Sequence, residues 1–472
     1  MSSPSTYKMV SLEAPGSDYF MTKTISLDEI PYSPDGCELF ARLRDLPGAA
    51  FLDSSFPHTT AGRYDILTAN PVETSLPQMP DGASESAARG YFDELGRFHR
   101  SYFSGIQPVS EDLPFCGGLL GYIGYDSGNA LNKVTTPWDE QSPPLQIHAY
   151  DWAVIQDHLL RRSVLATQPG VSAAARQDLL RRLRRPAKER SAPFSLRAPF
   201  VSNFTEQTYH QALEKIQTYI QAGDCYQANL AQRFSAGYAG DPWTAYCQLR
   251  PVAAAPFSAY LATDDGGAVL CLSPERFISL HGNHVETSPI KGTRPRYRDP
   301  AADQLAAREL QLSEKDRAEN LMIVDLLRND LGRSCIPGSI HVDRLFELQS
   351  FPTVHHLVST ISGELQSGRD ACDLLRDSFP GGSITGAPKR RSMEIIAEVE
   401  PDPRQTYCGS VLYISADGRM DSNIAIRTLL CSEDEIRCWG GGAIVADSQW
   451  QQEYQETYDK VGKFLNLLEE TL

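Results

Sequence analysis

Residues 268–290 read AVLCLSPERFISLHGNHVETSPI, and they indicate the kind of sheet that this chain builds. Apolar side chains typical of a strand lead to His281-Gly282-Asn283, a turn signal, and a second strand follows. This order predicts an antiparallel hairpin. A two-residue loop would place Glu275 and Lys291 on opposite faces, whereas a three-residue loop or one bulge would place both on one face. The sequence leaves these registers open.

The rest of the C-terminal part mixes helices and strands. One helix is clear because Tyr209, Leu213 and Ile216 recur at helical spacing after Thr205, a suitable N-cap. The sequence predicts helices over 205–223, 305–331, 389–398 and 449–472, and strands over 226–234, 268–280, 284–290, 406–414, 422–431 and 435–445. Because no regular β-α-β order is present, we predict an α+β fold with mostly antiparallel sheets.

An arginine-rich segment marks the clearest change in composition along the chain. Within 176–197, basic residues surround Pro186 and Pro193. This pattern predicts the polar end of a helix followed by a solvated linker, with an interaction patch as the alternative. The segment separates an N-terminal part, 1–195, from a C-terminal part, 200–472. Two domains and two halves of one core are both compatible with this division.

Composition limits the kinds of protein that this chain can be. The 472 residues carry 44 Lys and Arg against 60 Asp and Glu, a net charge of −16, which disfavours a nucleic-acid partner because binding the phosphate backbone requires clustered positive charge. No apolar run approaches the length of a membrane span, and residues 1–18 lack the basic start and apolar core of a secretory signal. The ten cysteines contain no C-x-x-C pair, so we expect reduced thiols, no zinc cluster and a cytoplasmic location.

Two glycine-rich segments resemble nucleotide-binding loops only superficially. The glycines of 117–124 are wrongly spaced for a dinucleotide loop, and 382–389 has Ala387 and Pro388 before Lys389, where a phosphate-binding loop needs glycine. Residues 381–385 precede a predicted helix, so they could offer backbone N–H groups to an anion or form a plain tight turn. Both interpretations remain open.

Two pairs of acidic residues fall at i,i+3 spacing on predicted helices: Asp316 with Glu319, and Glu453 with Glu456. Each pair presents two carboxylates on one helix face, and two such faces could hold a divalent cation that prefers oxygen ligands. The alternative is two solvated faces, since Glu456 stands four residues before Lys460 in ordinary ion-pair spacing.

Seven segments of the C-terminal part, taken in order, resemble the chorismate-utilising enzyme family. They are Ser273–Phe277, Pro289–Thr293, Arg317–Asp330, His355–Ser359, Gly381–Lys389, Asp421–Thr428 and Tyr454–Lys460, and the N-terminal part matches more loosely through Leu52–Ser54 and Gly117–Asp126. The resemblance implies one large body in which two large, mostly antiparallel sheets pack face to face with helices outside. The segment 181–197 would then cross between halves of one core.

Within that family, the motif at 289–293 separates the branches. It reads PIKGT here, and a lysine at its centre resembles the branch that aminates chorismate at C4 for p-aminobenzoate and folate synthesis. Branches that form anthranilate or isochorismate typically have alanine there. The amination needs ammonia, and no cysteine lies in the G-x-C-x-G setting of a glutaminase, so the resemblance implies a separate glutamine amidotransferase subunit. The alternatives are an anthranilate-forming enzyme, an isochorismate-forming enzyme and a non-catalytic amino-acid-binding relative.

The same resemblance assigns roles to individual residues. Glu275 is similar to the general acid/base for the C4 hydroxyl, and Lys291 is the expected nucleophile, adding at C2 of chorismate. Mg²⁺ is implied, with Glu319 and Glu456 as ligands and Glu453 beside them, while Asp316 stands where relatives often have another acid or an amide. The positions that hold the substrate are His356, Gly386, Tyr407, Arg427 and Lys460. The N-terminal half of the family can also hold tryptophan, and the candidates for that pocket, which could equally be core residues, are Ser54, Arg63, Tyr64, Pro256 and Phe257.

A lysine nucleophile must first lose its proton. At its ordinary pKa of about 10.4 an amine is almost wholly protonated at pH 7, so we expect burial or a nearby cation, such as Arg294 or Arg296, to lower the pKa of Lys291. Glu275 would oppose this while ionised. We therefore expect Glu275 to be protonated when it acts as an acid.

Overall fold

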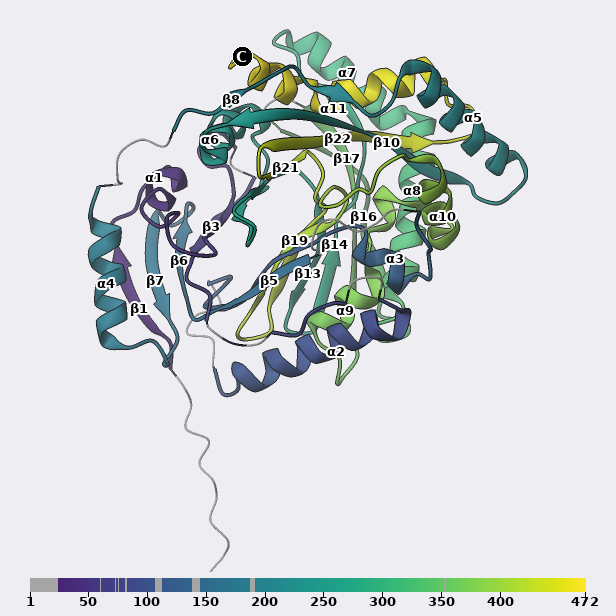
Figure 1. Cartoon of the computed structure of the whole chain (residues 1–472). Helices are drawn as coiled ribbons and strands as arrows, with labels where there is room; N and C mark the ends of the chain where they lie inside the picture. The colour runs from purple at the N-terminus through teal and green to yellow at the C-terminus, as the bar shows by residue number, and fades with distance from the viewer. Residues whose placement is uncertain are drawn as a thin grey trace, which may run out of the picture.

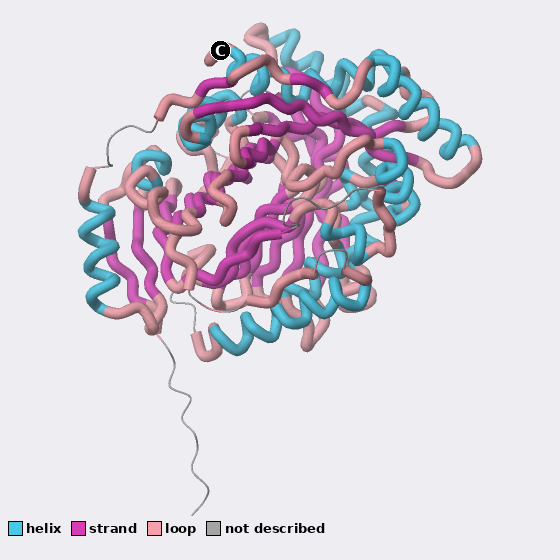
Figure 2. The backbone as a smooth tube through the Cα atoms, in the orientation of Figure 1, coloured by secondary structure: helices cyan, strands magenta, loops and turns pink. Residues whose placement is uncertain are grey.

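The computed structural model describes residues 24–59, 61–72, 74, 76–80, 83–106, 113–137, 145–186, 192–351 and 354–472. Residues 1–18, which lack the features of a secretory signal, and residues 187–191 of the linker lie outside these ranges. Twisted sheets occupy the middle of the molecule and helices lie around them (Figures 1 and 2). In the described residues, no helix is both long enough and apolar enough to cross a membrane.

The first sheet is antiparallel and takes strands from both sides of the linker. In the described residues its 13 strands are ordered β1 (Ser26–Ile30), β7 (Arg162–Thr167), β6 (Trp152–Asp157), β3 (Tyr64–Thr68), β2 (Ala50–Asp53), β11 (Phe257–Ala262), β12 (Ala268–Ser273), β21 (Thr428–Ser432), β22 (Glu435–Ile444), β10 (Gln227–Ala239) and β18 (Gly386–Ala387), with β8 (Ser195–Leu196) and β9 (Val201–Ser202) also paired to β10. The two parts of the chain meet where Leu52 of β2 lies opposite Ala259 of β11.

The second sheet is also antiparallel and also mixes the two parts. In the described residues its order is β15 (Ile290–Pro295), β17 (Val354–Glu364), β14 (His284–Thr287), β13 (Arg276–His281), β20 (Met420–Asn423), β19 (Ser410–Ser415), β4 (Gly118–Ile123) and β5 (Leu145–Tyr150), and β16 (His341–Ser350) pairs with β17. Here the parts meet where Gly121 of β4 lies opposite Leu412 of β19.

Helices cover the outer faces of the sheets. They are α1 (Gly36–Phe40), α2 (Glu85–Tyr102), α3 (Ser127–Leu131), α4 (Ala173–Arg184), α5 (Glu206–Gln221), α6 (Pro242–Ala253), α7 (Pro300–Leu312), α8 (Glu314–Leu331), α9 (Ala371–Ser378), α10 (Lys389–Val399) and α11 (Trp450–Glu469). The largest buried apolar cluster contains side chains of both sheets, such as Ile66 of β3 and Leu412 of β19. A second cluster joins the first sheet to α1, α4, α6 and α11. The predicted α+β fold with two large antiparallel sheets and helices outside is confirmed.

Three predicted elements are wrong because each is broken in the structure. The strand over 268–280 divides into β12 and β13, which belong to different sheets, since Pro274 has no N–H to continue the ladder. The strand over 422–431 likewise divides into β20 and β21, which belong to different sheets. The helix over 305–331 divides into α7 and α8 because the Ser313 side chain accepts a hydrogen bond from Asp316 N–H and caps a new helix.

A bulge decides the register that the sequence left open. The hairpin has the two-residue loop, since His281 lies opposite His284. The strands β14 and β15 pair with consecutive parts of β17, and the register shifts in β15 between Ile290 and Thr293, where Gly292 has φ +88°. The shift turns Lys291 to the side of Glu275.

Candidate active site

The candidate site begins at the corner where the chain passes from one sheet to the other. Glu275 lies between β12 and β13, and Arg427 lies between β20 and β21. The two crossings are held together because Ile424 N–H donates to the Glu275 carbonyl oxygen at 3.0 Å and Leu272 N–H donates to the Arg427 carbonyl oxygen at 3.1 Å. Two residues predicted to act on the substrate are therefore neighbours at one corner.

Ser383 connects the two predicted catalytic residues. Its hydroxyl donates to Glu275 Oε1 at 2.8 Å, and its carbonyl oxygen accepts from Lys291 Nζ at 2.9 Å. Ser383 belongs to the 3-10 turn Gly382–Ile384, which follows α9 and precedes β18. One residue thus fixes the acid and the amine on the same side of the corner.

Burial and charge set the protonation of this pair. Burial raises the pKa of Glu275 more than Lys291, Ser383 and Arg427 lower it. Burial lowers the pKa of Lys291, but the carboxylates of Glu319 and Glu275 together raise it above its ordinary value. A carboxyl with a raised pKa suits a proton donor, whereas the amine is held in its charged form.

The expectation that a nearby cation lowers the pKa of Lys291 is wrong. Arg294 forms an ion pair with Asp316 at 3.0 Å, and Arg296 forms one with Asp303 at 2.8 Å. Both guanidinium groups are therefore directed to other acids. Instead, Glu319 Oε1 lies 3.3 Å from Lys291 Nζ, and this contact stabilises the charged amine.

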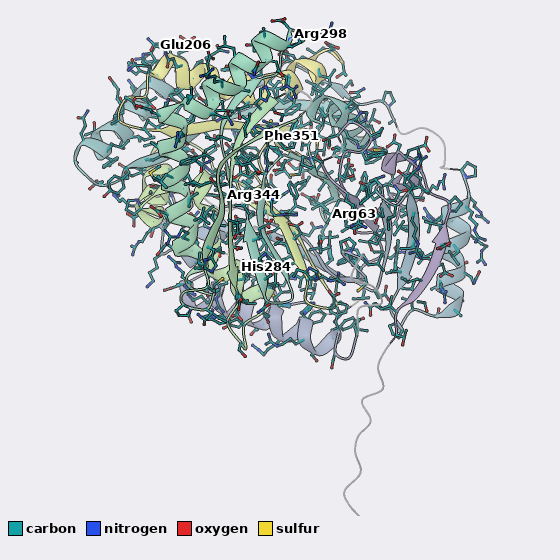
Figure 3. The ribbon with its side chains drawn as sticks, turned by 180° about the vertical axis from the view of Figure 1, so that it is seen from behind. Arg63, Glu206, His284, Arg298, Arg344 and Phe351 are labelled. Carbon is teal, nitrogen blue, oxygen red and sulfur yellow. The ribbon has the colours of Figure 1, made fainter. Side chains whose placement is uncertain are left out.

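His356 stands beside this group as a neutral imidazole. It is buried in β17, and its Nδ1 is hydrogen-bonded to the Thr293 hydroxyl at 2.9 Å. Burial lowers its pKa to about 4, and the nearby charge of Arg427 adds to the effect. The ring of Phe351 contacts it edge-on, with 5.4 Å between centroids. Figure 3 shows Phe351 among the C-terminal strands.

Arg427 is the cation available to an anionic substrate. It adopts φ +52°, a left-handed backbone conformation that places its side chain at the corner. Its guanidinium makes no ion pair or side-chain hydrogen bond with any residue in the described ranges. Burial lowers its pKa and the charge of Glu275 opposes that shift. A partly buried cation without a counter-ion favours the binding of a carboxylate.

The predicted metal ligands fall into two groups. Glu319 faces Lys291, as described above. Glu453 and Glu456 of α11 converge on Gly442, where a Cβ would lie 3.4 Å from Glu453 Oε2 and 3.3 Å from Glu456 Oε1. The charge of Glu456 also acts on Lys291, so the two groups face the same amine. Glu456 forms the ordinary ion pair with Lys460 at 2.6 Å.

The donor set suits a hard divalent cation, although its carboxylates do not form a ready-made cluster within the described residues. Within the part of the chain that the structure describes, no three Asp, Glu, His or Cys side chains gather at ligand distances. Carboxylate oxygens are nevertheless the ligands that Mg²⁺ prefers, and glycine at 442 keeps the space before two of them free of a side chain. Asp316 is paired with Arg294 at 3.0 Å. Mg²⁺ binding stays a prediction.

The remaining predicted substrate contacts lie around the same region. Gly386 has φ +141° in β18, and a Cβ there would lie 2.2 Å from the Gln227 carbonyl oxygen, so only glycine fits. Tyr407 is buried and stacks on Trp439 with 6.2 Å between ring centroids. Lys460 donates to the Gly441 carbonyl oxygen at 2.8 Å. Their contacts with substrate remain predictions.

Two residues that the sequence did not single out support the site. Ser383 is one. The other is Lys389, whose buried ammonium contacts Asp330 at 2.7 Å and donates to the carbonyl oxygens of Ser378 and Pro380 at 2.8 Å each. Lys389 therefore anchors the segment that carries Ser383. A lysine following a glycine-rich turn was the available signal, but its acidic partner is remote in sequence.

Four of the five predicted tryptophan candidates line a separate cavity of about 300 Å³. Arg63, Tyr64, Pro256 and Phe257 line it, together with Asp53 and residues of β19 and β20. Ser54 is buried next to it and donates to Asp65 at 2.7 Å. Figure 3 shows Arg63 beside the N-terminal strands. The lining includes every candidate except Ser54, and tryptophan binding in the cavity stays a prediction.

Comparison with known proteins assigns the chain to a family. A model of that family, described as chorismate binding enzyme, matches residues 57–466. The chain belongs to this family. It is 45% identical over 461 residues to aminodeoxychorismate synthase component 1 of Salmonella typhimurium, which covers 95% of this chain and 100% of the relative. It is also 45% identical over 437 residues to the Escherichia coli K12 protein of the same name, covering 91% of this chain and 95% of that protein.

A solved structure agrees with the architecture as well. Anthranilate synthase component I from Streptococcus pneumoniae superposes with a TM-score of 0.70 at 26% identity, covering 98% of this chain and 95% of that one. The resemblance predicted from the seven C-terminal segments is therefore confirmed at the level of family and fold.

Proposed function

We propose that this chain aminates chorismate at C4 with ammonia to give 4-amino-4-deoxychorismate, a precursor of p-aminobenzoate and folate. The observation that carries the proposal is that Lys291 and Glu275 are both hydrogen-bonded to one residue, Ser383. The 45% identity to proteins named aminodeoxychorismate synthase component 1 supports the same reaction. The free cysteines are consistent with a cytoplasmic enzyme.

The proposed reaction proceeds through a lysine-linked intermediate. Glu275, held protonated by burial, gives its proton to the C4 hydroxyl, which leaves as water. As that C–O bond breaks, the Lys291 amine, once deprotonated, adds at C2, and the two ring double bonds shift from C1–C2 and C5–C6 to C1–C6 and C4–C5. Ammonia then forms a bond to C4 while the C2–N bond breaks, the two double bonds return to C1–C2 and C5–C6, and the lysine leaves. The enolpyruvyl group is retained throughout.

Cations hold the substrate in this scheme. Mg²⁺ bound by Glu319, Glu456 and Glu453 would supply positive charge to a carboxylate of chorismate. Arg427 and Lys460 would pair with the carboxylates, and Gly386 and Tyr407 would line the same region. His356, neutral with a pKa of about 4, would contact the ring without adding charge.

Ammonia would come from a separate glutamine amidotransferase subunit. The name "component 1" of the relatives supports an assembly with a second component. The purified chain should therefore work with ammonium salts alone and should use glutamine only after that subunit is added. Glutamine-dependent turnover by the chain alone would contradict this arrangement.

The lysine-linked step has its own test. Wild type and Lys291→Ala are incubated with a chorismate analogue that reacts at C2, and the intact mass of each protein is measured. An adduct on wild type and none on the variant supports the step. An adduct on both, or on neither while the variant turns over normally, would make Lys291 a positioning charge only.

A further inference from the structure

Two cysteines differ from the other eight in their exposure. Eight of the ten cysteines are buried, whereas Cys37 and Cys247 are half-buried. These two are also neighbours: both pack against the apolar cluster that contains Phe40 and Trp243, and the proximity of Cys247 raises the pKa of the Cys37 thiol. The pair lies outside the candidate active site and has no part in the proposed reaction.

The packing of α1 on α6 fixes this neighbourhood. Asp35, the N-cap of α1, forms an ion pair with Arg250 at 3.0 Å. Phe40, at the other end of α1, packs on Trp243 with 5.0 Å between ring centroids. The start of α1 thus contacts the end of α6, and the end of α1 contacts the start of α6. Cys37 lies between the two contacts on α1, and Cys247 lies between them on α6. The positions of the two helices therefore bring the thiols toward each other, without depending on the conformation of one flexible side chain.

We propose that Cys37 and Cys247 form a modification site that takes small disulfides, such as oxidised glutathione, and closes into an intramolecular disulfide. One thiolate attacks a sulfur of the small disulfide, forming a mixed disulfide and releasing one thiol. The second thiolate attacks the protein sulfur of that mixed disulfide and releases the second thiol. Two cysteine thiols are oxidised, one small disulfide is reduced to two thiols, and each cysteine gives up one proton.

The environment makes this exchange selective and slow. The proximity of Cys247 and burial raise the pKa of Cys37, so little thiolate is present at neutral pH. The eight buried thiols exclude a reagent of the size of glutathione. Access then decides which pair reacts, and the pKa decides how quickly.

The crosslink would join α1 to a helix that supports the wall of the 300 Å³ cavity. Arg250 of α6 pairs with Asp53, which lines that cavity, at 2.6 Å. The chain then runs from α6 into Pro256 and Phe257 of the same wall. Oxidation should therefore raise the melting temperature, because a crosslink between remote residues restricts the unfolded chain.

The test uses the full chain incubated with oxidised glutathione at mildly alkaline pH for hours. Intact mass should fall by two hydrogen atoms, thiol titration after denaturation should find eight thiols and not ten, and non-reducing peptide mapping should join the Cys37 and Cys247 peptides. The melting temperature should rise, and a reducing agent should reverse every change.

Variants make the result specific. Cys37→Ser and Cys247→Ser should each abolish the crosslink and the redox-dependent shift in melting temperature, whereas Cys225→Ala, which removes a buried thiol, should keep both. A wild-type chain that stays reduced, carries only glutathione adducts, or joins a different pair of cysteines would overturn the proposal. None of these readouts depends on chorismate, so this test and the test of the proposed function fail independently.

Discussion

At the scale of single residues, Ser383 links the two proposed catalytic groups. Its hydroxyl holds the Glu275 carboxyl, and its carbonyl oxygen holds the Lys291 amine. Ser383→Ala removes only the first contact. A lost hydrogen bond to a buried acid is typically worth about 1–3 kcal/mol, so we expect kcat to fall about 5- to 150-fold with little change in KM. Steady-state kinetics with chorismate and ammonium measure both constants.

The matched control for this change is Ser378→Ala. Ser378 is a buried serine on the same segment whose hydroxyl has no hydrogen-bond partner within the described residues. Its removal should leave kcat close to wild type. Equal losses in the two variants would show that the segment as a whole, and not the Ser383 hydroxyl, supports catalysis.

His356 predicts how stability depends on pH. Its folded-state pKa of about 4 lies below the ordinary value of 6.5, so the unfolded chain takes up the proton first as the pH falls. The histidine therefore leaves the free energy of unfolding unchanged above about pH 7 and lowers it progressively from about pH 6.5 toward about pH 4. From pH 7.5 to 5, wild type should lose about 2 kcal/mol more unfolding free energy than His356→Gln. Urea unfolding at both pH values measures this, and equal losses would contradict the neutral imidazole.

The carboxylates predict a dependence on Mg²⁺. Glu319→Gln and Glu456→Gln each remove one negative oxygen donor from the proposed site, so each should lower activity by at least about 100-fold and raise the Mg²⁺ concentration needed for half-maximal activity. Asp325→Asn is the control, because Asp325 lies on the same helix as Glu319 but pairs with Arg328 at an exposed position. Variants at Glu319 and Glu456 that keep normal rates without added Mg²⁺ would place the metal elsewhere.

At the scale of elements, the bulge in β15 predicts the effect of a single methyl group. A Cβ on Gly292 would lie 2.8 Å from Leu310 Cδ1 and 3.0 Å from Asp316 Cβ, at φ +88°. Gly292→Ala should cost about 1–3 kcal/mol of stability and displace Lys291, so kcat should fall sharply. Gly282→Ala, at φ +61° with open space around it, should cost less stability and leave kcat unchanged. Similar kinetics for the two variants would mean that the bulge does not position the lysine.

The same elements show what the sequence could and could not predict. Local patterns identified the hairpin, the helix capped by Thr205 and the C-terminal helix, because spacing and caps are visible within a few residues. The corner at Pro274 was missed because apolar residues continue on both sides of it, although β12 and β13 lie in different sheets.

The candidate site shows a similar limit. The family resemblance supplied Glu275, Lys291 and Arg427 as site residues, and the structure brings them together. It could not supply Ser383 as their common partner, because its two contacts span 108 and 92 residues of sequence. The raised pKa of Lys291 was missed for the same reason, since it depends on Glu319 and Glu275, which reach the amine only in the folded chain.

At the scale of the whole molecule, both sheets run through both parts of the chain. The first sheet is joined by β2 and β11, the second by β4 and β19, and the site lies where the chain passes between the sheets. The corner that carries Glu275 and Arg427 is therefore held by the whole body and not by one local segment. Such a rigid support suits a reaction that requires an acid and a nucleophile to act on one ring.

The most direct test of the central claim is the identity of the product. The purified chain is incubated with chorismate, Mg²⁺ and ¹⁵N-labelled ammonium, and the product is analysed by mass spectrometry and NMR while free pyruvate is measured. We predict 4-amino-4-deoxychorismate, with the label on C4, the enolpyruvyl group retained and no pyruvate released. Anthranilate with an equivalent of pyruvate, or isochorismate without any label, would contradict the account.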